Sequence, residues 1–214
     1  MTKFLPQVRL ATAFAILVSV VWQVTDRLFH NNFRPGEYFA YFTIHTSLIA
    51  AVVLTVTAVR ELQGKTDTKA LTLARLSVST YAIVVAVVYN ALLRGTPVLP
   101  GDPDYGYDWP VLPNEILHVW APIFILLDFA LTVTATKLKF KQIFWTLLFP
   151  LAWLIFTIIR GLNTNWWAYW FLNPNEKGGV SGVIAFILAI VVFMLVSATI
   201  SLSLNRLLGK APKH

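Results

Sequence analysis

Long apolar stretches alternate with short polar, charged clusters along the chain. The stretches free of charge are 10–25, 38–59, 76–93, 116–127 continuing as 129–136, 142–159 and 178–205. Only Asp128 interrupts the fourth. With their flanking residues, these stretches have the roughly 20 residues that an α-helix needs to cross about 30 Å of hydrocarbon. The pattern therefore predicts an all-α integral membrane protein with six transmembrane helices in one domain, residues 1–214.

The expected spans, with flanking residues included, are about 8–29, 38–60, 71–94, 112–136, 141–160 and 178–206. The first span resembles a secretory signal, because Lys3 and Arg9 precede it. The sequence Asp26-Arg27-Leu28-Phe29 follows it in place of small residues, so no cleavage site is expected and the helix is retained.

Composition supports the membrane class and excludes several others. Only 13% of the residues are charged and 57% are hydrophobic, whereas a soluble domain has about 25% charged residues. A net charge of +7 would suit a nucleic-acid partner in a soluble chain, but this composition excludes that partner. The chain has no cysteine, so disulfides, thiolate metal sites and cysteine nucleophiles are excluded.

The basic residues predict the orientation. One side of the membrane would have both termini and the second and fourth loops, with twelve basic residues: Lys3, Arg9, Arg60, Lys65, Lys69, Arg75, Lys137, Lys139, Lys141, Arg206, Lys210 and Lys213. The other side would have five: Arg27, Arg34, Arg94, Arg160 and Lys177. Because cytoplasmic loops are enriched in lysine and arginine, we expect a multi-pass protein of the cell membrane with both termini cytoplasmic.

Two outer loops have distinctive compositions. Residues 95–113 have five of the eleven prolines and three aspartates, which is typical of an ordered, turn-rich loop. The last outer loop contains Trp166, Trp167 and Phe171. These aromatic residues suit the interface between lipid and water, and they also suit the mouth of a site in the outer leaflet.

The fourth span has a polar stripe along one helical face. At about 100° per residue, one sector of the helix contains Asn114, His118, Ala121, Ile125, Asp128 and Thr132. Polar groups within a span are costly in lipid, so this stripe is expected to face the bundle interior. Asp128 would lie about 15 Å deeper than His118, as a buried protonated acid or an interhelical hydrogen-bond partner.

The second span has hydroxyl groups at a matching depth. Thr43 and Ser47 share a face, which taken alone is typical of helix packing in membranes. Thr43 and His118 each lie six residues into their spans, about 9 Å below the outer boundary. If the two helices are neighbours, an imidazole there would activate a hydroxyl nucleophile, with Asn114 orienting the imidazole or stabilising an oxyanion.

Other chemistries fit less well. Gly179-Val180-Ser181-Gly182 matches the nucleophile motif of rhomboid proteases, but His214 is the only histidine after it, so small-residue packing is favoured. Only His45 and His118 lie within spans, enough for one haem at most. No span contains a lysine for a Schiff base, and no broken-helix repeat indicates a transporter, although a small carrier stays open.

Three segments together resemble the androgen-induced gene / androgen-dependent TFPI-regulating protein family, including its small bacterial members. They are Tyr41-Phe42-Thr43, the stretch from Asn114 through His118 and Pro122 to Asp128, and Trp167-Ala-Tyr169-Trp-Phe171-Leu172. Their order and spacing agree over nearly the whole chain. The departures are Trp170, where the family usually has proline, and the additional Ile123 after Pro122.

The resemblance implies a six-helix hydrolase that cleaves fatty acid esters of hydroxy fatty acids. It places the nucleophile on Thr43 and the base on His118, with no metal or cofactor. Asn114, Ser47 or Tyr169 would support the oxyanion, and a membrane lipid or fatty acid ester would be the substrate. The alternative is a non-catalytic multi-pass protein, such as a lipid-binding scaffold, a small transporter or a subunit of a complex. The sequence does not indicate an oligomeric state.

Overall fold

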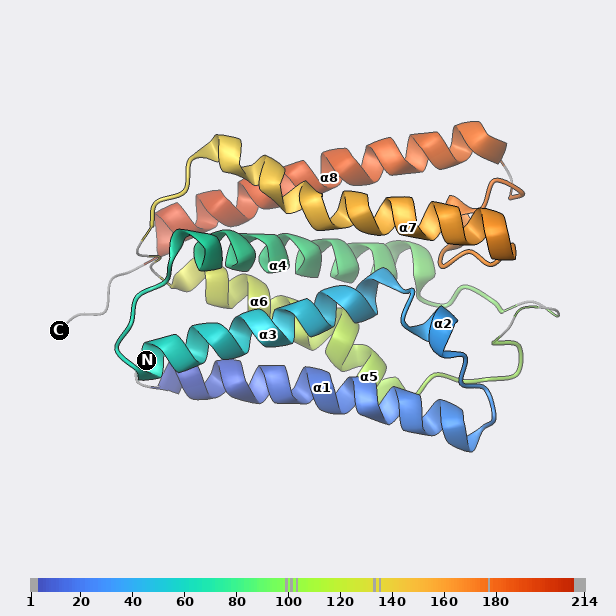
Figure 1. The fold of residues 1–214 in the computed structure, drawn as a ribbon, viewed down its shortest axis with the longest axis horizontal. Helices are drawn as coiled ribbons and strands as arrows, with labels where there is room; N and C mark the ends of the chain where they lie inside the picture. The colour runs from blue at the N-terminus through green and yellow to red at the C-terminus, as the bar shows by residue number, and fades with distance from the viewer. Residues whose placement is uncertain are drawn as a thin grey trace.

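The computed structural model describes residues 4–98, 100, 102, 104–132, 134, 136–176 and 178–209. Within these residues the chain is all α-helical, without strands, and six helices are long and apolar enough to cross a membrane (Figure 1). The six-helix fold predicted from the sequence is confirmed, and the chain is a multi-pass membrane protein. The spanning segments are Leu5–Phe29, Phe42–Leu62, Lys69–Leu93, Val111–Leu131, Phe140–Thr164 and Gly179–Leu208.

Three spans are single α-helices and three are composite. The single helices are α1 (Leu5–Phe29), α3 (Phe42–Leu62) and α8 (Gly179–Leu208). The third span is α4 (Lys69–Val88) followed by the π-helical turn η2 (Tyr89–Leu93). The fourth joins α5 (Val111–Glu115), the π-helical turn η3 (Ile116–Trp120) and α6 (Ala121–Leu131). The fifth joins the 3-10 helix η4 (Phe140–Leu147) and α7 (Leu148–Thr164).

Each span differs by a few residues from its expected bounds, and for two of them the reason can be identified. The second begins at Phe42 because Pro35–Tyr38 forms a separate short helix, α2, before it. The fourth ends at Leu131 because Asn205 of α8 donates its side-chain amide to the carbonyls of Phe129 and Thr132, at 2.5 and 2.8 Å. This amide satisfies carbonyl groups that have no partner within the helix.

The π-helical turn η3 lies immediately before Pro122. A proline in a helix has no N–H to donate, and its ring clashes with the carbonyl four residues earlier, which here belongs to His118. The backbone N–H of Ala121 donates to the carbonyl of Ile116, five residues earlier, and not to the carbonyl four residues earlier as in an α-helix. The wider turn accommodates the proline, and His118 is the middle residue of this turn. Such turns are frequent at functional sites.

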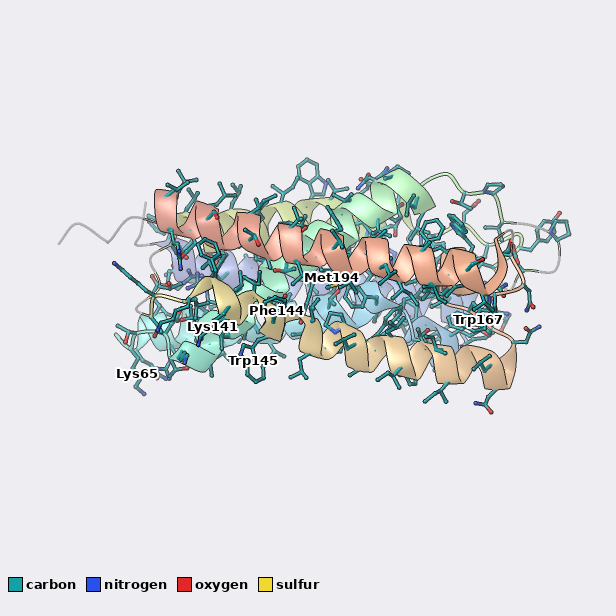
Figure 2. All side chains as sticks on the ribbon, turned by 90° about the horizontal axis from the view of Figure 1, so that it is seen from above. Lys65, Lys141, Phe144, Trp145, Trp167 and Met194 are labelled. Atoms are coloured by element: carbon teal, nitrogen blue, oxygen red, sulfur yellow. The ribbon has the colours of Figure 1, made fainter. Side chains whose placement is uncertain are left out.

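Helix α4 lies at the centre of the bundle, where it packs against α3, α6 and α8, and α1 packs against α3 (Figure 1). The start of α1 and the end of α8 lie together at one end of the bundle, the termini end. Figure 2 shows Lys65 and Lys141 at the termini end and Trp167 at the opposite end.

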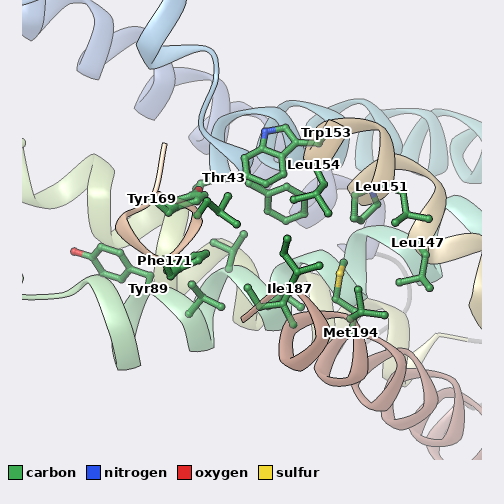
Figure 3. A pocket seen from close by; sticks show the side chains of 18 of the residues that line it. Thr43, Tyr89, Leu147, Leu151, Trp153, Leu154, Tyr169, Phe171, Ile187 and Met194 are labelled. Atoms are coloured by element: carbon green, nitrogen blue, oxygen red, sulfur yellow. The ribbon is translucent and has the colours of Figure 1, made fainter. Parts of the chain in front are cut away.

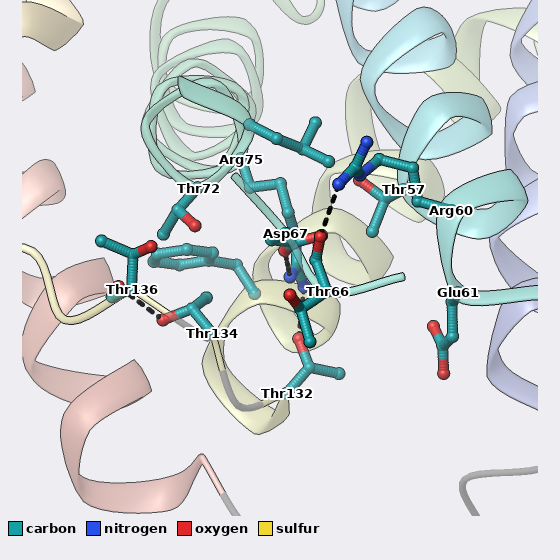
Figure 4. A network of polar contacts seen from close by, with 12 residues as sticks. Thr57, Arg60, Glu61, Thr66, Asp67, Thr72, Arg75, Thr132, Thr134 and Thr136 are labelled. Carbon is teal, nitrogen blue, oxygen red and sulfur yellow. Dashed lines mark hydrogen bonds and ion pairs between the residues drawn. The ribbon is translucent and has the colours of Figure 1, made fainter. Parts of the chain in front are cut away.

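A network of charges joins four helices, α1, α3, α4 and α6, at the termini end. Asp128 of α6 is 5% exposed, and its two oxygens accept from Arg9 of α1 at 2.7 Å and from Arg75 of α4 at 3.2 Å. Arg9 also pairs with Glu61. Arg75 pairs with Asp67 at 2.6 Å, and Figure 4 shows these two residues close together. Asp128 is therefore an interhelical hydrogen-bond partner, which is one of the two roles predicted for it.

Gly161 permits the close packing of α7 on Trp167. A Cβ atom at this position would lie 2.5 Å from the indole ring, well inside van der Waals contact. We expect Gly161→Ala to lower the free energy of unfolding by about 1–3 kcal/mol, because the ring must shift. Gly36→Ala is the control, since its Cβ would meet only Arg160 at 3.8 Å. Thermal unfolding in detergent checks this, and equal melting temperatures of the two variants would contradict it.

Candidate active site

An apolar cavity lies between α3, α4, α7 and α8 (Figure 3). It encloses about 760 Å³ of space free of protein atoms, including the part that is open to the surroundings. Figure 3 shows Thr43, Tyr89 and Tyr169 at one end and Leu147, Leu151 and Met194 at the other. The cavity is therefore polar at one end only, a shape and chemistry that suit an alkyl chain with a polar group at its end.

The polar end is built around the first turn of α3. Thr43 is the second residue of this helix and is 8% exposed. The Tyr169 hydroxyl lies against the Thr43 side chain and the backbone of Phe42 and Thr43. The first backbone N–H groups of a helix have no partner within it, and those of Phe42 and Thr43 bind the Tyr169 hydroxyl oxygen instead.

Tyr169 is a neutral phenol under ordinary conditions. Burial raises its pKa to about 12, although the hydrogen bonds from Thr43 and from the backbone of Phe42 and Thr43 act in the opposite direction. A phenol that stays protonated donates a hydrogen bond but does not take up a proton. Tyr169 therefore fits the stabilisation of a developing negative charge on a carbonyl oxygen, and it does not fit the role of a base.

His118 lies next to this end of the cavity and is separated from it by the ring of Tyr89. The imidazole stacks on the Tyr89 ring, with 3.9 Å between the ring centroids. Its Nδ1 atom is 2.9 Å from the carbonyl of Asn114. Because a carbonyl only accepts, Nδ1 carries the hydrogen, and in the neutral ring the lone pair is on Nε2. His118 thus has the tautomer that a base acting through Nε2 requires.

Asn114 holds both partners of this stack. Its carbonyl orients the imidazole, whereas its side-chain amide donates to the Tyr89 hydroxyl at 2.6 Å. An orienting role was predicted for Asn114, and the backbone carbonyl performs it. The amide group is already engaged, so Asn114 is not positioned as a donor to an oxyanion at Thr43.

Thr43 and His118 do not form a hydrogen bond with each other among the described residues. Thr43 lines the cavity and contacts Tyr169, while His118 lies outside the cavity lining and contacts Tyr89. Tyr89 is the link, because it lines the cavity and also stacks on the imidazole. The direct contact that equal depth suggested is therefore absent from this conformation.

The other predicted residues lie at different distances from the cavity. Phe171 lines it and stacks on Tyr169, with 5.2 Å between ring centroids. Trp166 and Trp167 are not in the lining; Trp166 contacts Tyr41, and Trp167 packs against Gly161. Ser47 is buried one turn after Thr43 and does not line the cavity, so the structure gives it no role in binding an oxyanion there.

Sequence reasoning did not identify Tyr89. It directly follows the apolar run 82–88 of the third span, where Tyr89-Asn90 is the next polar pair. That pair was the available signal, but its relation to His118 depends on how two distant spans pack. The apolar lining from α4, α7 and α8 was also not predicted, because valine, leucine and isoleucine are common on every face of these helices.

Comparisons with family models, with curated proteins and with solved structures find no match to this chain. The family resemblance seen in the sequence therefore stays a prediction.

Proposed function

We propose that this protein is a membrane-embedded hydrolase of lipid carboxylic esters, with Thr43 as the nucleophile and His118 as the base. The observation that carries the proposal is the position of the Thr43 hydroxyl at the polar end of an apolar cavity. An acyl chain in the cavity would place its ester carbonyl beside this hydroxyl. The resemblance of three sequence segments to a family of threonine hydrolases supports the same roles.

The reaction has two steps. Thr43 Oγ attacks the ester carbonyl carbon while His118 Nε2 takes the threonine proton and passes it to the leaving alcohol, which leaves an acyl-threonine ester. Water then attacks this ester, His118 takes the proton of the water, and Thr43 leaves with a proton. The net reaction converts one ester and one water into one acid and one alcohol. Tyr169, whose hydroxyl oxygen accepts from the first amides of α3, donates its hydrogen to the carbonyl oxygen as that oxygen becomes negative.

A movement of Tyr89 is part of this proposal. Its ring stacks on His118 and also forms part of the cavity wall near Thr43. A lipid that fills the cavity would press on this wall. Rotation of the Tyr89 side chain would then open a path between His118 Nε2 and the Thr43 hydroxyl.

The test combines an esterase assay with labelling of the purified protein by a fluorophosphonate probe. The wild type is expected to hydrolyse a long-chain p-nitrophenyl ester and to be labelled. Thr43→Ala and His118→Ala are expected to lose both properties. Equal labelling of the wild type and both variants would remove the proposal, because the labelled residue would then lie elsewhere.

The second candidate function is lipid binding without catalysis. The observation that favours it is the absence of a hydrogen bond between Thr43 and His118 in the described structure. Under this alternative the wild type would bind a long-chain ester and release it unchanged, and the probe would not label it. The same two assays therefore distinguish the candidates.

The depth of the cavity should determine which chain lengths are accepted. Ile190 of α8 lines the cavity, so Ile190→Trp is expected to lower kcat/KM for a sixteen-carbon ester by at least about tenfold. The value for a four-carbon ester should change little, because a short chain does not reach the added ring. Leu188→Trp on the same helix is the control, since Leu188 is 60% exposed. An equal loss for both esters would contradict a cavity that accommodates the acyl chain.

We also propose that both termini are cytoplasmic, which places the polar end of the cavity in the outer leaflet. The twelve basic residues assigned to the termini side, against five on the other, support this orientation. Because the chain has no cysteine, single cysteines at Lys65 and Asn163 provide a clean test. A membrane-impermeant maleimide applied to intact cells should label only the cysteine at position 163, and the reverse result would overturn the orientation.

A further inference from the structure

Arg160 differs from the other arginines at the end of the bundle opposite the termini. Three of them form ion pairs, which are Arg27 with Asp104 at 2.6 Å, Arg34 with Glu37 at 2.8 Å and Arg94 with Glu115 at 2.7 Å. Arg160 has no carboxylate partner within the described part of the chain, and its Nη1 atom is buried without a hydrogen bond. A buried donor without a partner costs free energy, so this nitrogen is suited to a ligand.

Arg160 lies beyond the polar end of the cavity. It follows Trp153 by seven residues on α7, so both side chains project from the same face of the helix, about 10 Å apart along its axis. Trp153 lines the cavity and donates its indole N–H to the carbonyl of Ala40 at 2.9 Å. A lipid that lies along this face of α7 would therefore extend from the cavity toward Arg160.

Aromatic rings connect Arg160 with the polar end of the cavity. The guanidinium lies over the Trp166 ring, 4.2 Å from its centroid. The ring centroids of Trp166 and Tyr41 lie 5.6 Å apart, and those of Tyr41 and Tyr169 lie 5.9 Å apart. The ring of Trp166 fixes the plane of the guanidinium by a cation–π interaction without using its N–H groups. These groups remain available for an anion.

A second unpaired donor lies nearby. Trp167 packs against Gly161, the residue after Arg160, and its buried indole N–H also lacks a partner among the described residues. A guanidinium presents a planar fork of donors that matches the oxygens of a carboxylate or a phosphate. Tryptophan is suited to the level of the lipid headgroups, because its ring is apolar whereas its N–H group can reach water or a headgroup.

We infer that Arg160, together with Trp166 and Trp167, binds the carboxylate or phosphate of an anionic lipid whose chain occupies the cavity. This inference rests on the proposed function for the identity of the cavity ligand. The ester carbonyl lies at Thr43 and the negative charge lies further along α7, at Arg160.

The test measures binding to the Thr43→Val protein, which lacks the nucleophile, by calorimetric titration in neutral maltoside micelles at pH 8. The probes are dodecanoate, dodecyl phosphate and dodecanol, which share one alkyl chain. At least one anion is expected to bind about tenfold or more tightly than dodecanol. The tighter anion identifies the source of the charge as a fatty acid or as a phosphate headgroup.

Variants of Arg160 separate charge recognition from folding. Arg160→Gln in the Thr43→Val protein is expected to remove the preference for the anions and to leave dodecanol binding unchanged, whereas Arg160→Lys should keep part of the preference. Lys65→Gln removes a charge at the termini end and should change nothing. Ile190→Trp should weaken the binding of all three probes.

Three results would overturn the inference. The first is equal affinity of the Thr43→Val protein for the anions and for dodecanol, and the second is an unchanged preference for the anions after Arg160→Gln. The third is an equal loss of affinity for all three probes in both Arg160 variants, which would show that Arg160 has only a structural role. Because the protein in this titration is inactive by design, these results are independent of hydrolysis. A wild type that binds anions but does not cleave esters would refute the proposed hydrolase and leave the anion site intact.

Discussion

Replacing Thr43 with valine is expected to lower the hydrolysis of a long-chain ester by at least about 10³-fold. Valine keeps the shape of threonine and removes the hydroxyl that forms the acyl intermediate, so the protein loses its nucleophile with little change in packing. Thr43→Ser keeps the hydroxyl and should stay within about tenfold of the wild type. The measurement is the steady-state rate in detergent at saturating ester.

The control for this substitution is Thr55→Val on the same helix. The Thr55 hydroxyl donates to the carbonyl of Ala51, at 2.8 Å, and lies outside the cavity lining. This variant should hydrolyse the ester at close to the wild-type rate. Similar rates for the two valine variants would show that the Thr43 hydroxyl takes no part in the reaction.

Removing the carboxylate of Asp128 should have the largest effect on stability. Asp128→Ala is expected to lower the free energy of unfolding by about 3–5 kcal/mol, because Arg9 and Arg75 would lose a partner that accepts from both of them inside the bundle. Both arginines are less than 5% exposed, so water does not replace the lost hydrogen bonds. Thermal unfolding in detergent, followed by circular dichroism, measures the effect.

Glu61→Ala provides the matched comparison in the same network. Glu61 pairs with Arg9 but has a side chain that is 39% exposed, so its loss should cost no more than about 1 kcal/mol. Asp128→Ala should therefore unfold at a clearly lower temperature than Glu61→Ala. If both variants melt together, the buried pairs of Asp128 do not stabilise the bundle as described.

The sequence predicts the fold well because bilayer thickness imposes a length on each helix. Charge-free runs locate all six spans, and the differences arise at their ends. The early end of the fourth span depends on Asn205, which reaches it from a helix more than seventy residues later. Contacts of this kind depend on packing, which periodicity does not reveal.

The candidate site is predictable only in part, for the same reason. Hydrophobic periodicity identifies the inward faces that carry Thr43 and His118, and equal depth brings them to one level of the bundle. It does not place Tyr89 between them, nor does it relate Tyr169, in a loop, to the first turn of α3. The partners of Asp128 were missed because Arg9 and Arg75 lie at span ends, where basic residues usually indicate orientation.

The most direct test of the account is to locate the acyl group on the protein during turnover. The wild type is mixed with p-nitrophenyl dodecanoate, quenched in acid within milliseconds, digested and examined by mass spectrometry. The account predicts a dodecanoyl group on Thr43 that disappears in Thr43→Val. A dodecanoyl group on another residue, or turnover by Thr43→Val at the wild-type rate, would contradict it.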